Sequence, residues 1–124
     1  MIIIGDEKIP YNKIEKISNI NDIKNSKPNS TLLFEYNIKL IQYCHKNDLN
    51  CAVIIKNINQ LLYSASYNTK YAISTHNLAK KIQKIVENYM YDIKILSIIK
   101  SSNDLEKIAL DEIDGCIYDK LLKI

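Results

Sequence analysis

Short apolar runs recur along this chain at a nearly constant interval. Five of them begin at residues 31, 51, 71, 93 and 115, so their starts are 20 to 22 residues apart. Each run is almost continuously apolar, whereas a strand with one solvent-facing side alternates apolar and polar residues. Continuous apolar runs of this length are typical of parallel strands that are buried on both faces. The runs cover residues 31–36, 51–56, 71–75, 93–99 and 115–118.

The segments between the runs have the 3.6-residue periodicity of amphipathic helices. Between residues 58 and 67, apolar side chains recur at positions i, i+3, i+4 and i+7, and Asn57 precedes them as an N-terminal cap. Alternating strands and helices predict βα units, and therefore an α/β fold with a mostly parallel five-stranded sheet. The expected helices cover 38–49, 58–67 and 78–89, with another opening at Ser102 or Asn103, where Asn103 and Glu106 have capping-box spacing, and a short one from Asp119 through Ile124.

The first thirty residues do not follow this regular spacing. Gly5 and Asp6 separate two short segments, and glycine at the first turn position favours the type II′ turn of a two-residue hairpin within residues 2–9. An edge strand near 14–18 and a helical turn near 20–25 are expected next. We therefore predict a single domain over residues 1–124, in which an N-terminal hairpin or edge segment (1–30) precedes the βα repeats (31–124).

Two strand orders are compatible with these units. If the strands lie in sequence order, the helices cover one face of the sheet, and a second copy of the chain must cover the other apolar face. If the order reverses once, both faces are covered within one chain. A homodimer is expected under the first order.

Composition and charge exclude several classes of function. The chain is 47% hydrophobic and 25% charged, and its apolar runs are too short to span a bilayer. The net charge is only +3, the lysines are interspersed with acidic residues and there is no arginine, so we expect no nucleic-acid partner. The N-terminal apolar run is too short, and is followed too soon by acidic residues, for a secretory signal, which favours a cytoplasmic location.

Cysteine, histidine and glycine positions give no metal, disulfide or nucleotide motif. The three cysteines, Cys44, Cys51 and Cys116, lack a C-x-x-C spacing and lie in apolar segments, as expected of buried free thiols. Neither histidine has a partner at zinc-ligand spacing, so no metal is expected. With only two glycines, the chain lacks the glycine-rich loops that hold dinucleotides and triphosphates, and no cofactor is expected.

Chemistry in a parallel α/β sheet is expected where the strands end. Ligands bind outside the carboxyl ends of such strands, where loops and helix N-termini meet. Lysines, hydroxyls and free backbone N–H groups at this rim favour a small anionic ligand, although helix capping and solvation also explain the same residues. The candidate ligand-binding residues are Glu35, Lys56, Asn57, Thr75, His76, Lys100 and Ser102.

Two of these lysines occupy equivalent places in a short internal repeat. Residues 54–59 and 98–103 both have the sequence Ile-Ile-Lys-x-x-Asn, so Lys56 and Lys100 each close an apolar run just before a predicted helix. This match indicates two βα units of the same local design.

The absence of a complete catalytic motif leaves three hypotheses for function. The first is a cytoplasmic, non-catalytic binding or interaction module, with a small anionic ligand at the strand ends. The alternative is a small lyase or isomerase acting on a phosphorylated or carbonyl substrate, with Lys56 or Lys100 as the amine and Glu35 or His76 as the acid or base. The third is nucleic-acid binding through the lysines at positions 80, 81 and 84, which the low net charge disfavours.

One segment resembles part of a known architecture. Residues 105–118, Leu-Glu-Lys-Ile-Ala-Leu-Asp-Glu-Ile-Asp-Gly-Cys-Ile-Tyr, are similar to the helix, Asp-Gly turn and short strand of many (βα) barrel units, where such segments lead into phosphate-binding loops. Here Asp119-Lys-Leu-Leu follows in place of the glycines and serines usual in those loops. As a whole, the chain resembles a half-length (βα) barrel or a small flavodoxin-like domain.

Overall fold

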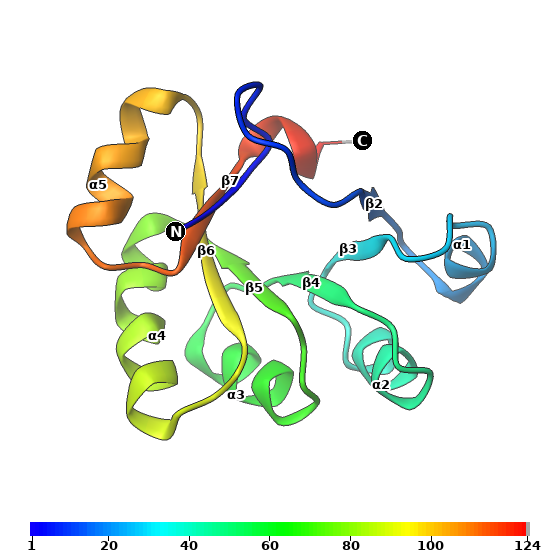
Figure 1. Ribbon diagram of the computed structural model, residues 1–124. Coiled ribbons are helices and arrows are strands. Elements are labelled where there is room, and N and C mark those ends of the chain that lie inside the picture. The colour runs from blue at the N-terminus through cyan, green and yellow to red at the C-terminus, as the bar shows by residue number, and fades with distance from the viewer. Residues whose placement is uncertain (124) are drawn as a thin grey trace.

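The computed structural model describes residues 1–123 and has one seven-stranded sheet (Figure 1). All neighbouring strands pair in parallel, as the continuous apolar runs predict. The sheet has two more strands than the five expected, because two strands of the N-terminal segment join it. The strands are β1 (Ile2–Ile4), β2 (Ile14–Lys16), β3 (Thr31–Glu35), β4 (Cys51–Ile54), β5 (Tyr71–Ser74), β6 (Lys94–Ile99) and β7 (Gly115–Tyr118).

The predicted N-terminal hairpin is wrong. Strand β1 pairs with β7 at the far end of the chain, in a register that places Ile2 opposite Gly115. Residues 7–9 form a turn and no second strand. The physical reason is burial on both faces: Ile4 belongs to the core inside the sheet, while Ile3 packs on the helix side. A two-stranded hairpin would leave part of this apolar run in water.

Strands β2 to β7 lie in sequence order, and β1 lies beyond β7. β1 and β2 are therefore the two edges of the sheet. This order excludes the doubly wound, flavodoxin-like alternative and agrees with the half-barrel alternative. The predicted edge strand near 14–18 and the helical turn near 20–25 are confirmed as β2 and helix α1 (Ile20–Lys24).

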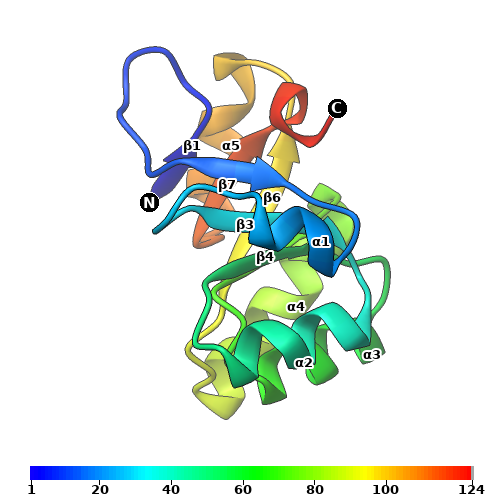
Figure 2. The same ribbon diagram turned by 90° about the vertical axis from the view of Figure 1, so that its right-hand side faces the viewer.

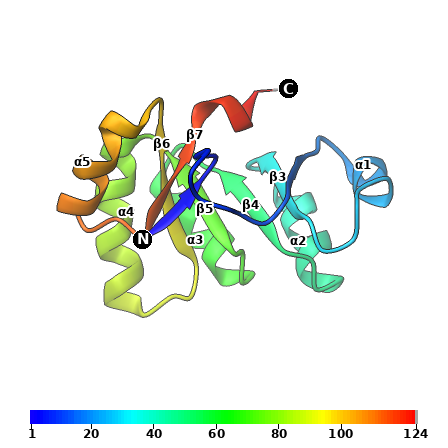
Figure 3. The ribbon, with the colours of Figure 1, turned by 45° about the horizontal axis from the view of Figure 1, so that its top comes forward.

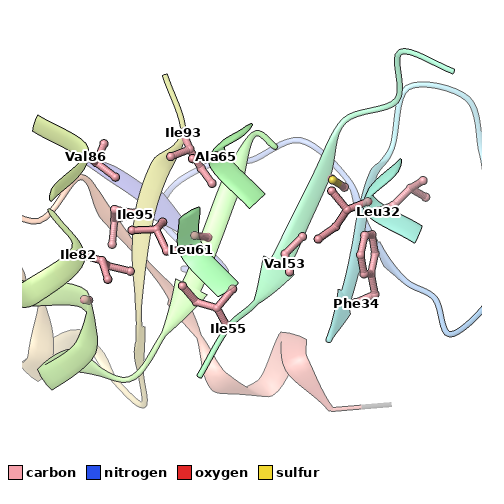
Figure 4. Close-up of a cluster of buried hydrophobic side chains, with 14 of the residues drawn as sticks. Leu32, Phe34, Val53, Ile55, Leu61, Ala65, Ile82, Val86, Ile93 and Ile95 are labelled. Atoms are coloured by element: carbon pink, nitrogen blue, oxygen red, sulfur yellow. The ribbon is translucent and has the colours of Figure 1, made fainter. Parts of the chain in front are cut away.

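Five α-helices follow β2 to β6 and pack on one face of the sheet (Figures 1 and 2). Each contributes at least one buried side chain to the same hydrophobic cluster, part of which is drawn in Figure 4. The predicted helices are confirmed, and the three cysteines are buried free thiols as expected. After α1 come α2 (Ile38–Lys46), α3 (Ile58–Ser66), α4 (His76–Tyr89) and α5 (Leu105–Leu110), which a short 3₁₀ helix (Ser102–Asp104) precedes.

Two details of the helix termini differ from the prediction. The capping box before α5 is formed by Ser101 and Asp104, not by Asn103 and Glu106. Ser101 is the last residue with extended backbone, so its hydroxyl is the group that faces the free N–H groups of the first turn. At the end of the chain a 3₁₀ helix covers Asp119–Leu122, and Ile124, the predicted end of that helix, lies outside the described residues.

The central side chains on the inner face of the sheet are buried within one chain. The sheet curls (Figure 3). Inner side chains of distant strands therefore meet, and Ile4 of β1 belongs to the same cluster as Leu33 of β3. Every buried member of this cluster is at most 5% exposed. The argument that a second copy must cover this face therefore does not apply, and the homodimer stays a prediction. The buried members are Ile4, Leu33, Ala52, Ile73, Leu96 and Ile117.

The two edges of the curled sheet are linked without strand pairing. Loop 5–13 runs from the end of β1 back to the start of β2 (Figure 2). The Lys16 ammonium on β2 donates a hydrogen bond of 2.6 Å to the carbonyl oxygen of Leu122 at the other end of the chain. The arrangement is half-barrel-like.

Candidate functional site

One cavity lies where the chain omits a helix. Strands β2 to β6 each lead into a helix, whereas β1 leads into loop 5–13. Between this loop, the carboxyl end of β6 and helix α5 is a cavity of about 470 Å³, a volume typical of small-molecule sites. We call it the β1–α5 cavity. It is lined by residues 5–9 and 100–102 together with Ile3, Leu105, Tyr118 and Lys120.

Three lysines border this cavity from three separate segments. Lys8 belongs to the loop after β1, Lys100 follows β6, and Lys120 follows β7. The Lys120 ammonium is 5.6 Å from the centroid of the Tyr118 ring, within range of a cation–π contact. Within residues 1–123, no carboxylate lies within 4 Å of any of these three ammonium groups. Lys8 and Lys120 act on Asp6 only at longer range, where their charges help to lower its pKa.

Asp6, an acidic residue of the lining, accepts two hydrogen bonds that stabilise its ionised form. The Tyr118 hydroxyl donates a bond of 2.5 Å to Asp6 Oδ2, and the Lys8 backbone N–H donates one of 2.8 Å to Asp6 Oδ1. The first of these bonds is the main reason why the pKa of Asp6 lies below its ordinary value of 3.8. The same bond, with burial, raises the pKa of Tyr118 to about 12. Gly5, at φ +103°, lets the chain turn tightly enough to bring Asp6 over Tyr118.

Replacing Asp6 with asparagine is expected to lower the pKa of Tyr118 from about 12 towards the ordinary value of 10, because the charged acceptor is lost. Titration of ¹³C-labelled tyrosine rings by NMR measures this directly. The bond favours ionised Asp6 and neutral Tyr118, so its contribution to stability is lost as the pH falls below 3.8 and as it rises from 10 towards 12. Tyr118→Phe should weaken the dependence of stability on pH in both the acidic and the alkaline range. An unchanged alkaline dependence would contradict the Asp6–Tyr118 hydrogen bond as its cause.

The structure brings two of the seven predicted site residues into this cavity. Lys100 and Ser102 line it, together with Ser101. Glu35 lines a different cavity of about 340 Å³ that also contains Lys16. Within residues 1–123, no ion pair of 4 Å or less joins Glu35 to Lys56, one of the two lysines proposed as the amine of a lyase or isomerase.

The remaining predicted residues lie at the N-termini of α3 and α4. Lys56 is exposed after β4, and Asn57 caps α3 through a bond from the Gln60 backbone N–H. Thr75 is the exposed N-cap residue of α4, but its side chain makes no capping bond. His76, the first residue of α4, is bonded to Asp111.

The internal repeat is conserved in local structure but not in surroundings. The Lys56 backbone N–H donates to the side chain of Gln60 at 2.8 Å, and the Lys100 backbone N–H donates to that of Asp104 at 3.1 Å. Side chains therefore already occupy backbone N–H groups at both helix starts. Of the lysines, hydroxyls and backbone N–H groups expected to hold an anion at this rim, the lysine and serine side chains therefore remain the main candidates.

Ser97, His76 and Asp111 form a hydrogen-bonded chain that is structural. His76 Nε2 lies 2.6 Å from Asp111 Oδ2, and His76 Nδ1 lies 3.4 Å from the Ser97 hydroxyl. These are the residue types of a nucleophilic triad. Ser97, however, is completely buried on β6, so no substrate can reach its oxygen in this conformation. The chain of bonds instead ties α4 to β6 and to the end of α5.

The cavity residues that sequence reasoning missed belong mostly to the N-terminal loop. Asp6, Lys8 and Ile9 reach the site only because β1 pairs with β7, and the hairpin prediction placed them elsewhere. The continuous run Ile2–Ile4 was the available signal, because it has the same character as the other buried parallel strands.

Comparisons with known proteins add no family assignment, since neither a family model nor a curated protein matches this chain. In the part of the chain that the structure describes, no cluster of three or more His, Cys, Asp or Glu side chains is arranged to bind a metal. No helix within residues 1–123 has the length and apolar character needed to cross a membrane.

Proposed function

We propose that this chain is a non-catalytic binding module for a small anionic ligand, which it holds in the β1–α5 cavity. The observation that carries the proposal is the convergence of three lysines and two serine hydroxyls on one cavity at the carboxyl ends of β1, β6 and β7. None of these lysines forms an ion pair within residues 1–123. This is the edge of a parallel sheet where ligands bind in other α/β proteins.

Charge and geometry support an anion over a cation or a neutral ligand. The three lysines outnumber the two acidic side chains of the lining, and Asp6 already accepts two hydrogen bonds from the protein. Ser101 and Ser102 are exposed and supply hydroxyl donors beside Lys100. Charge-assisted hydrogen bonds to such a ligand contribute more than bonds between neutral groups.

Binding is favoured over lyase or isomerase chemistry because the groups for that chemistry are separated. Lys100 lines the β1–α5 cavity, whereas Glu35 lines the cavity that contains Lys16. His76 is held by Asp111 on the helix side of the sheet. The proposal keeps the cytoplasmic location expected from the sequence.

Lys100→Ala is expected to weaken binding of n-butyl phosphate about tenfold or more, since it removes a charged hydrogen-bond donor from the cavity. Isothermal titration calorimetry on the full chain measures the change. Lys46→Ala, an exposed lysine at the end of α2, is the matched control and should leave the affinity unchanged. Lys56→Ala should also leave it unchanged. A loss with Lys56→Ala and none with Lys100→Ala would move the site away from this cavity and overturn the proposal.

A further inference from the structure

The β1–α5 cavity has an apolar wall in addition to its lysines. Ile3 of β1 and Leu105 of α5 are only partly buried against the helix-side core, and both line the cavity. Ile9 of the loop lines it as well and is 40% exposed. Three apolar side chains from three separate elements therefore border the same space.

The absent helix explains why this apolar surface is available. In the other βα units the helices cover the outer face of the sheet, as α4 does over β5 and β6 and α5 does over β7. After β1 the chain turns at Gly5 into a loop, and the half-buried Ile3 is left beside a cavity. An apolar group placed there would remove this surface from water.

The volume of the cavity indicates how large a ligand it can hold. A volume of about 470 Å³ is within the range of sites that enclose an organic molecule, and a bare phosphate or acetate ion would fill only a small part of it. Lysines alone would be sufficient for such an ion, whereas the apolar wall would make no favourable contact with it.

Resting on the proposed function, we infer that the ligand is amphiphilic: an anionic head of the phosphate or carboxylate type bound by Lys100 and Lys120, and a short apolar body packed against Ile3, Ile9 and Leu105. Two kinds of interaction then contribute to one binding event. The charged head gives a salt-dependent part of the affinity, and the apolar body gives a part that grows with its area.

A series of alkyl phosphates tests this inference on the full chain. The probes are inorganic phosphate, methyl phosphate, n-butyl phosphate and n-hexyl phosphate, with n-hexanol as the uncharged comparison, each titrated by calorimetry. Affinity is expected to rise with chain length, by up to about fourfold per methylene that becomes fully buried. Ile9→Ala should reduce this rise, so that n-hexyl phosphate loses about three- to tenfold in affinity while inorganic phosphate loses almost none.

The matched control is Ile58→Ala, because Ile58 on α3 is 39% exposed and lies outside the lining of this cavity. It should leave the whole series unchanged. Equal affinity for inorganic phosphate and n-hexyl phosphate would overturn the amphiphilic ligand and leave the anion-binding proposal intact. If n-hexanol bound as tightly as n-hexyl phosphate, or if no phosphate bound at all, the anion-binding proposal itself would fail.

Discussion

Substituting Gly115 with alanine is expected to lower the free energy of unfolding by about 3 kcal/mol, the upper end of the effects of overpacking. The added Cβ would lie 2.3 Å from the carbonyl oxygen of Ile2 and 2.6 Å from the Ile2 Cβ. These are mainly atoms that no side-chain rotation can move. Because Ile2 is the direct partner of Gly115 in the β1–β7 pair, strand β1 must separate from β7.

Chemical denaturation measures the loss of unfolding free energy, and amide hydrogen exchange measures the separation of β1 from β7. Exchange at Ile2 and Ile3 should accelerate far more than exchange in the central strands. Gly5→Ala is the comparison in this chain: its Cβ would meet only side-chain atoms, at 3.0 Å, although the positive φ adds backbone strain. Gly5→Ala is therefore expected to lower the free energy of unfolding by less than Gly115→Ala does. Gly115→Ala with wild-type stability would mean that β1 does not pair with β7 as described.

Truncating Ile73 to alanine is expected to cost about 3 kcal/mol, within the usual range for a buried isoleucine. Ile73 lies on the central strand β5, is 0% exposed and belongs to the cluster on the inner face of the curled sheet. Removing most of its side chain leaves a cavity among residues that the other strands hold in place. Urea denaturation followed by circular dichroism measures the loss.

The same experiment tests whether one chain buries the inner face. The loss caused by Ile73→Ala should be the same at low and high protein concentration, because the neighbours of Ile73 in the inner cluster belong to its own chain. Ile58→Ala, at an exposed isoleucine, should change stability by less than about 0.5 kcal/mol. A midpoint that rises with concentration, together with a small effect of Ile73→Ala, would instead indicate that a second copy covers this face.

Local patterns were sufficient to predict most elements of this fold. Each strand from β3 to β7 was found from a continuous apolar run, and Asn57 was identified correctly as the cap of α3. The parallel direction also followed from the runs, and it placed Lys100 and Ser102 at the carboxyl edge where the cavity lies. These features depend on residues that are close together in sequence, so the sequence pattern carries them.

Features that depend on distant residues were not predictable in this way. The turn signal of Gly5 and Asp6 is the same whether Ile2–Ile4 pairs with the next segment or with β7. Only the competition between those pairings, decided by how much apolar surface each buries, selects β7. Lys56 and Lys100 likewise have the same local sequence pattern. They differ in tertiary surroundings, because the loop after β1 lies beside Lys100 and not beside Lys56.

The sequence by itself determined which segments are strands and helices, and that the strands are buried in a parallel sheet, because hydrophobic period and capping act over a few residues. The tertiary structure decided that the sheet curls until inner side chains of distant strands meet, and that β1 joins the far edge. The curl results from the accumulated twist of seven strands, and the position of β1 results from its pairing with β7, which is distant in sequence. The β1–α5 cavity exists only as a result of that pairing.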